Sequence, residues 1–125
     1  MRYTLLMHYQ EMTPEELGPE MLEQGEAAMN SYAATLQQAG VLLGAEVLQP
    51  SHASTTVTTQ DGKLRIQDGP FADTKERLGG YFLIDVPDLD AAIKWAGQAP
   101  AAMWGSVEIR PGATHTVDGT WVPNA

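Results

Sequence analysis

The stretch GGYFLIDVPDLD, residues 79–90, decides the fold of this 125-residue chain. Residues 79–86 are its most apolar run and predict a strand. Pro87 then ends the strand, and Asp88 is the expected cap of a helix. The apolar side chains at helical spacing in that helix are Leu89, Ala92, Ile93 and Ala96. A strand joined directly to an amphipathic helix indicates a small domain of mixed α and β structure.

A similar strand and helix are expected at the N-terminus. Residues 2–9 alternate in the manner of a strand, and both of its faces carry apolar side chains, so we expect an interior strand covered on both sides. Thr13 and Glu16 form a capping box that starts a short helix. Pro19 predicts that the main helix restarts there, and Gly40 is a suitable end for it.

The rest of the chain supplies further strands and a hairpin. Strands are predicted at 41–48 and 106–110. Residues 55–60 and 63–68 flank Asp61-Gly62, a dipeptide typical of the type I′ turn of a hairpin. Without this inserted hairpin the element order is βαββαβ, the pattern of a ferredoxin-like split βαβ fold in the α+β class.

One face of such a sheet is left open by its helices. Because the predicted strands carry apolar residues on both faces, we expect a second copy of the chain to cover the open face, which gives a homodimer. The alternative is cover by the long hairpin and by the tail at residues 112–125, which can form a small hairpin of its own.

Composition excludes several classes of function. Lys and Arg number 7 against 16 Asp and Glu, so the net charge of −9 argues against nucleic acid and membrane surfaces as partners. The absence of cysteine excludes disulfides, thiolate zinc sites and a cysteine nucleophile. The sequence shows neither a signal peptide nor an apolar run of about 20 residues, so we expect a cytoplasmic protein.

Several motifs within residues 1–111 resemble the DGPF-domain branch of the YCII-related proteins. The most specific are DGPFADTKE at 68–76 and GGYF at 79–82, and other matching stretches are MRYTLLM at 1–7, GVL at 40–42, VPDLD at 86–90 and GSVEIRP at 105–111. The resemblance implies a domain over residues 1–111, built as a ferredoxin-like protomer of a dimeric α/β-barrel. Residues 112–125 are then a C-terminal tail.

The resemblance implies less about chemistry. Some YCII relatives are thought to use a His–Asp pair on small aromatic substrates, and DGPF members often sit beside alternative sigma-factor genes, which suggests a regulatory role. We therefore expect a small-molecule-binding or regulatory dimer. The alternative is a cofactor-independent acid/base enzyme that acts on a small aromatic or carboxylate metabolite.

The DGPF loop supplies the first candidate site residues. Asp68 and Lys75 are candidate ligand contacts, and Asp73 is a candidate acid or base. Phe71 is expected to anchor the loop to the core. In the structural alternative the two aspartates bond the loop's own backbone, and Lys75 pairs with Glu76.

His8 is the candidate general base, because an imidazole ordinarily titrates near neutral pH. It needs a carboxylate within hydrogen-bond reach, for which Asp73, Asp68 and Glu46 are the candidates. The alternative is a histidine whose hydrogen bonds are satisfied within the core.

Arg110 and Tyr81 complete the candidate ligand contacts. Arg110 can bind a carboxylate or phosphate through two N–H groups, or it can pair with Glu108 on the same strand face. Tyr81 lines a pocket or packs against neighbours. The three histidines lack metal-binding spacing, and no phosphate loop or dinucleotide fingerprint is present, so we expect no metal and no cofactor.

Overall fold

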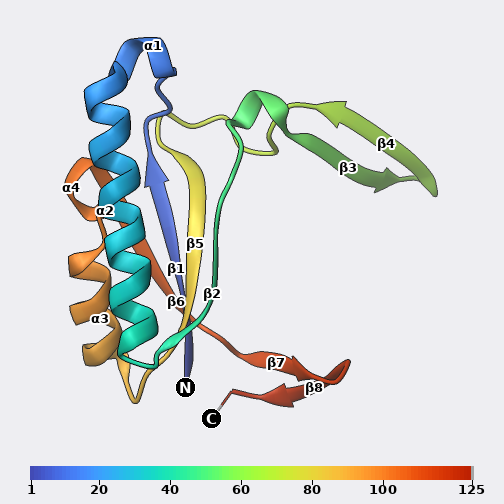
Figure 1. The fold of residues 1–125 in the computed structure, drawn as a ribbon. Coiled ribbons are helices and arrows are strands. Elements are labelled where there is room, and N and C mark those ends of the chain that lie inside the picture. The colour runs from blue at the N-terminus through green and yellow to red at the C-terminus, as the bar shows by residue number, and fades with distance from the viewer. Residues whose placement is uncertain (125) are drawn as a thin grey trace.

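The computed structural model describes residues 1–124 and contains a four-stranded antiparallel sheet with two separate hairpins. The sheet has the order β2-β5-β1-β6, and its strands are β1 (Arg2–Tyr9), β2 (Leu42–Val47), β5 (Arg77–Asp85) and β6 (Gly105–Pro111). Helices cover one of its faces, chiefly α2 (Pro19–Gln38) and α3 (Leu89–Gln98), as Figure 1 shows. The predicted α+β class and antiparallel sheet are therefore confirmed.

Capping residues set the helix boundaries near the N-terminus. The Thr13 hydroxyl accepts a hydrogen bond from the Glu16 amide at 3.1 Å, and the Glu16 carboxylate accepts one from the Thr13 amide at 3.0 Å. This is the predicted capping box, and it starts the short helix α1 (Pro14–Leu17). Helix α2 restarts at Pro19, also as predicted, because proline suits the first turn of a helix.

The helical segment after β5 differs in part from its prediction. Asp88 caps α3 by accepting from the Ala91 amide at 2.9 Å, as expected. Only Ala92 and Ala96 of its apolar face are buried, whereas Leu89 and Ile93 are each 50% exposed. A second short helix, α4 (Ala101–Trp104), follows at once and was not predicted.

The hydrophobic core lies between the sheet and the helices. Tyr32 of α2 packs edge-on against Phe82 of β5, with ring centroids 5.0 Å apart, and its hydroxyl donates to the Trp95 carbonyl at 2.7 Å. Burial raises the pKa of Tyr32 to about 12. The other buried side chains are Tyr3, Leu5, Met7, Leu36, Ile84, Val86, Ala92, Ala96, Ala99 and Ala101.

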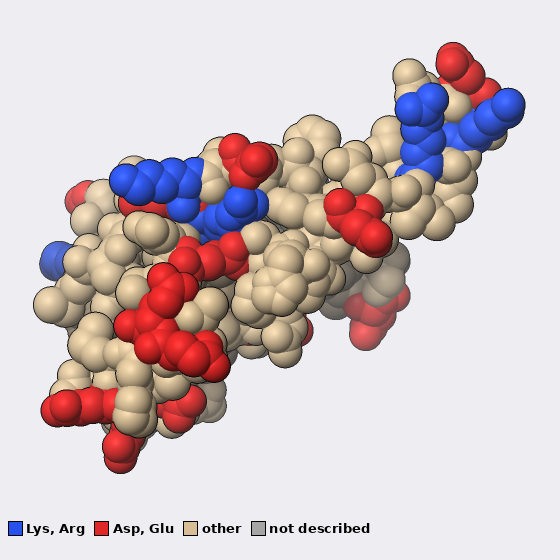
Figure 2. Space-filling view, turned by 90° about the horizontal axis from the view of Figure 1, so that it is seen from above, with Lys and Arg blue, Asp and Glu red and all other residues tan. Residues whose placement is uncertain are grey.

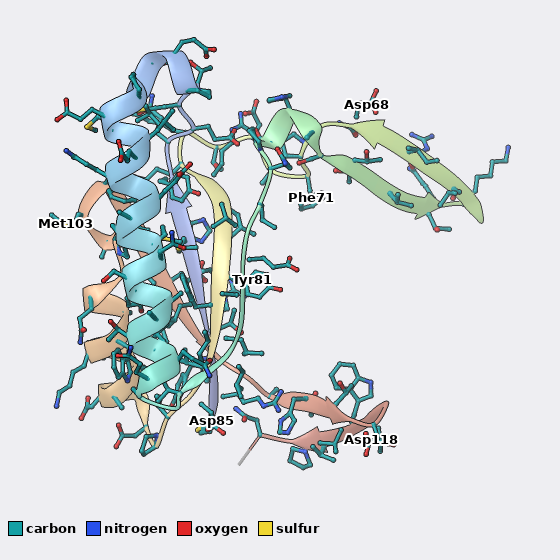
Figure 3. The ribbon with its side chains drawn as sticks, in the orientation of Figure 1. Asp68, Phe71, Tyr81, Asp85, Met103 and Asp118 are labelled. Atoms are coloured by element: carbon teal, nitrogen blue, oxygen red, sulfur yellow. The ribbon has the colours of Figure 1, made fainter. Side chains whose placement is uncertain are left out.

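No helix of residues 1–124 covers the opposite face of the sheet. The strand register places Leu6 beside Tyr81 and Glu108, and Thr4 beside Leu83 and Arg110. Tyr81 points away from the helices in Figure 3. Strand β1 is an interior strand, as predicted, but the helices cover only the face that carries Tyr3, Leu5 and Met7.

Two hairpins project on the side of this open face. Strands β3 (Thr55–Gln60) and β4 (Lys63–Asp68) turn at Asp61 and Gly62, whose φ angles of 52° and 75° fit the predicted type I′ turn. Strands β7 (Thr114–Val117) and β8 (Thr120–Pro123) form a hairpin in the tail. In Figure 1 both hairpins flank the open face rather than lie across it.

Asn124, which the sequence did not single out, ties the tail to β1. Its side chain accepts from the Arg2 amide at 2.9 Å and donates to the Arg2 carbonyl at 3.0 Å. It also donates to the Gly112 carbonyl at 2.6 Å, so it closes the base of the tail hairpin. None of the helices in residues 1–124 combines the length and apolar character that crossing a bilayer requires.

Candidate functional site

A hollow of about 990 Å³ lies where the end of β1 meets the DGPF loop. The sheet contributes His8, Ser106 and Glu108 to its wall, and residues within the segments 48–56 and 70–78 form the rest. Pockets that hold small organic molecules measure about 300–1,000 Å³, so the hollow has room for such a ligand.

His8 and Glu108 form a hydrogen-bonded pair on this wall. His8 Nε2 lies 3.0 Å from Glu108 Oε1, and the two side chains are 30% and 39% exposed. Because a carboxylate only accepts, Nε2 carries the proton, and in the neutral imidazole the lone pair then lies on Nδ1. The hydrogen bond with Glu108 therefore fixes the tautomer of His8 at the edge of a solvent-accessible hollow.

Arg110 extends the pair to a row of three charged or titratable groups. Its Nε donates to Glu108 Oε2 at 2.6 Å, so each oxygen of Glu108 has its own partner. The hydrogen bond from Arg110 is the largest cause, followed by the bond with His8, of a lowered pKa for Glu108. Glu108 is thus held ionised beside the imidazole. Arg110 lies in this row and is absent from the wall of the hollow.

The prediction that Asp73, Asp68 or Glu46 is the carboxylate partner of His8 was wrong. Strand register explains the difference, because His8 faces Ser106 across β1 and β6, and Glu108 is its diagonal neighbour on the same face. Glu46 lies on β2, which β5 separates from β1. Asp68 ends the outlying strand β4, and Asp73 bonds to an arginine instead.

Arg77, which was not among the predicted ligand contacts, is the arginine on the wall of the hollow. Its Nη2 donates to Asp73 Oδ1 at 2.6 Å, and its Nε lies 3.4 Å from Glu11 Oε1. The predicted ligand contact Lys75 is exposed and does not line the hollow. The structure therefore brings Arg77, rather than Lys75, to the site.

Glu11 holds this side of the hollow together and was also missed. It accepts from the Ser51 amide at 2.5 Å and from the Ser51 hydroxyl, in addition to its contact with Arg77. Burial acts to raise the pKa of Glu11, but the bonds from Ser51 and the charge of Arg77 outweigh it and lower the pKa. One carboxylate thus links the end of β1, the turn at Ser51–Ala53 and the start of β5.

Glycines permit the close strand approach beneath His8. A Cβ on Gly105 would lie 2.1 Å from the His8 carbonyl oxygen, and one on Gly79 would lie 2.1 Å from the ring of Tyr9. The Tyr9 hydroxyl donates to the Gly79 carbonyl at 3.3 Å, which fixes the ring in this space. A Cβ on Gly80 would lie 2.5 Å from the Glu46 carbonyl oxygen, so the Gly79-Gly80 pair is explained by the close packing of β5 against its neighbouring strands.

The DGPF loop is held by its backbone and not by its phenylalanine. Phe71 is 92% exposed, so the prediction that it anchors the loop to the core was wrong. The Gly69 amide donates to the Ser54 carbonyl at 2.8 Å, and the Thr56 hydroxyl donates to the Gly69 carbonyl at 2.8 Å. Gly69 has φ 106°, a conformation that glycine adopts freely, and Phe71 is left at the mouth of the hollow.

Tyr81 lies on the open face of β5, beside Leu6 and Glu46, and does not line the hollow. Of the predicted site residues, the structure therefore places only His8 in the wall itself. Within residues 1–124, no three His, Asp or Glu side chains gather closely enough to hold a metal ion.

Residues 1–113 match the model of the YCII-related domain family. The chain belongs to this family. Another protein to which this YCII-related chain is similar is the uncharacterized protein R00369 of Rhizobium meliloti (strain 1021). The two are 37% identical over 98 residues, which cover 74% of this chain and 79% of that protein.

Among solved structures, the chain is similar to 5-chloro-2-hydroxyhydroquinone dehydrochlorinase (TftG) from Burkholderia phenoliruptrix AC1100, in complex with 2,5-dihydroxybenzoquinone. The match has a TM-score of 0.49 at 12% identity and covers 88% of this chain and 91% of that one. Nothing of that enzyme's chemistry is carried over to the site at this level of similarity.

Proposed function

We propose that this YCII-related chain, of the DGPF type, binds a small aromatic or carboxylate metabolite in the hollow beside His8, and that His8 acts there as a general base. One observation carries the proposal. His8 Nε2 lies 3.0 Å from the ionised Glu108 carboxylate, at the wall of a hollow large enough for a small organic molecule.

In the proposed step, His8 Nδ1 takes a proton from an acidic O–H or C–H group of the ligand. The bonding electron pair stays on the ligand, and the imidazolium that forms keeps its Nε2–H bond to Glu108. The Arg110 bond keeps Glu108 in place beside this imidazolium. Two side chains suffice for such a proton transfer.

A non-catalytic binding or regulatory module is the second candidate. Among the described residues, the one arginine on the wall is Arg77, and two carboxylates of the same chain already neutralise it. Such a network of ion pairs can serve only to hold the loop in place, without any role in a reaction.

Ligand binding and proton transfer can be separated with chosen probes. A thermal-shift series with benzoate, 4-hydroxybenzoate and phenylpyruvate detects binding, because a ligand of the native state raises the melting temperature. The exchange of the β-hydrogens of phenylpyruvate in D₂O, followed by NMR, then reports base catalysis. His8→Gln should retain binding and lose the exchange. His52→Gln, outside the wall of the hollow, is the matched control and should keep both.

Equal exchange rates for the wild type and His8→Gln would refute the general base. If the probes bind in the hollow but the wild type does not catalyse exchange of the β-hydrogens of phenylpyruvate, the binding module is supported instead.

We further infer that two ferredoxin-like protomers pair through their open sheet faces into a dimeric α/β-barrel. The strand order β2-β5-β1-β6 and the half-buried Leu6, Tyr81 and Leu83 support this arrangement. Light scattering should give twice the mass of one chain at micromolar concentration, and Leu83→Lys should lower it. A monomer under the same conditions would contradict the inference.

A further inference from the structure

The β3–β4 arm, residues 55–68, stands away from the body of the molecule in Figures 1 and 3. Within residues 1–124, its two strands pair with each other and with no other strand. All six residues of β4 are exposed, as are five of the six in β3. An isolated two-stranded hairpin is marginally stable in water, so packing of the exposed arm against another surface would stabilise it.

One face of the arm is mainly apolar and ends at Asp68, the other face carries two cations, and Asp61 lies in the turn between the strands. Val57 lies opposite Ile66 and Thr59 lies opposite Leu64, so three apolar side chains share one face. Val57, Leu64 and Ile66 are 59%, 64% and 67% exposed. Lys63 and Arg65, two of the chain's seven Lys and Arg residues, belong to the other face.

Helices α1 and α2 carry the complementary surface. No Lys or Arg occurs between residues 3 and 62. Met12 and Met21 are 48% and 58% exposed beside this acidic stretch. In Figure 2 blue side chains, with red ones beside them, lie at the far end of the arm, and red side chains gather over the body, where blue ones also lie. The exposed glutamates of the two helices are Glu15, Glu16, Glu20, Glu23 and Glu26.

The arm is long enough to reach this surface on a second copy. Strands of six residues span about 20 Å, and packed sheets lie about 10 Å apart. The arm therefore extends beyond a facing sheet to the helices behind it. The arm and α1 lie at the same end of the molecule in Figure 1, so the contact requires a twofold axis parallel to the strands, which brings one arm to the second copy's α1.

We propose that each β3–β4 arm grips a second copy of the chain. Its apolar face covers the second copy's Met12 and Met21. Since the ribbon is only two strands wide, the long side chains of Lys63 and Arg65 reach past its edge to the glutamates of α1 and α2. The inference rests on the proposed face-to-face dimer and adds a contact that this dimer does not require.

Cross-linking tests the contact directly, because the chain has no cysteine of its own. One preparation carries Lys63→Cys and another carries Glu20→Cys, and the two are mixed before a short bis-maleimide is added. A cross-linked heterodimer is expected. Lys94→Cys on α3 replaces Lys63→Cys in the matched control and should give at least tenfold less product. Equal yields from the two mixtures would overturn the proposal.

Charge reversal separates the arm from the face-to-face dimer. Lys63→Glu with Arg65→Glu should raise the dimer dissociation constant at least tenfold, and mixing with a Glu20→Lys, Glu23→Lys chain should restore the affinity. Lys94→Glu is the charge-matched control. A dimer unaffected by the reversal would refute the arm and leave the face-to-face dimer standing. A wild-type monomer at micromolar concentration would overturn both.

Discussion

The two faces of the central sheet are built from the same strands, yet they have different roles. The helix-covered face buries Leu5 and Met7 almost completely. The open face carries half-buried Leu6 and His8 from the same strand, together with Glu108 from the next one. Strand alternation therefore assigns the buried core to one face and leaves the side chains of the other face accessible for the proposed chemistry and association.

Neighbouring leucines on β1 give the sharpest contrast in stability. Leu5→Ala should lower the free energy of unfolding by about 3 kcal/mol, because Leu5 is 0% exposed and the cavity cannot be filled by water. Leu6→Ala is the matched control, and it should cost less than half as much while weakening self-association. Urea unfolding measures both values. Equal losses would break the distinction between the two faces.

The close approach of β6 to His8 predicts the next largest effect. Gly105→Ala should destabilise the fold by about 2 kcal/mol, since a Cβ would lie 2.1 Å from the His8 carbonyl oxygen. Gly97→Ala in α3 meets nothing within 4 Å and should stabilise the protein by about 0.5 kcal/mol. Thermal unfolding of both variants tests this pair. A neutral Gly105→Ala would contradict the described packing.

Burial of Tyr32 on the covered face makes the stability of the fold depend on pH in the alkaline range. Its pKa, about 12, lies above the ordinary value of 10.0, so folding favours the neutral phenol. The stability from this preference is complete below pH 10 and is lost as the pH rises toward 12. Tyr32→Phe should remove this pH dependence and cost about 1 kcal/mol near neutral pH, through loss of the bond to Trp95. Unfolding curves from neutral to alkaline pH measure both effects.

The smallest change in stability is expected on the open face. Glu108→Gln should leave the unfolding midpoint nearly unchanged, because the pair with His8 is partly exposed and ion pairs in contact with solvent contribute little to stability. The variant should instead allow the His8 imidazole to populate both neutral tautomers, not only the one with the proton on Nε2. Long-range ¹H–¹⁵N spectra of the ring report the tautomer. An unchanged mixture in Glu108→Gln would show that Glu108 does not orient His8.

Local signals in the sequence predicted the elements whose causes are local. The Thr13 cap and the Asp61-Gly62 turn depend on residues only a few positions apart, and both are confirmed. Apolar periodicity and turn residues predicted the element order, and the family resemblance agreed with it. The four-residue α4 carries no strong signal of its own, because packing against β1 and β6 stabilises it.

Contacts between distant segments could not be predicted in the same way. The sequence placed Glu108 and Arg110 on one strand face, but the partner of His8 depends on the register of β1 against β6. Alternation on both strands predicts which side chains share a face, but the pairing of His8 with Glu108 also requires the register between the strands. Glu11 and Asn124 act across 40 and 122 residues, respectively, and neither stands in a distinctive motif.

A ligand titration followed through the histidine rings tests the central claim most directly. The chain has three histidines, so the ring signals of His8, His52 and His115 can be assigned separately. With benzoate, 4-hydroxybenzoate and phenylpyruvate as probes, binding should shift the His8 signals most, and His8→Gln should abolish β-hydrogen exchange of phenylpyruvate. Saturable binding that leaves the His8 signals unmoved would contradict the account.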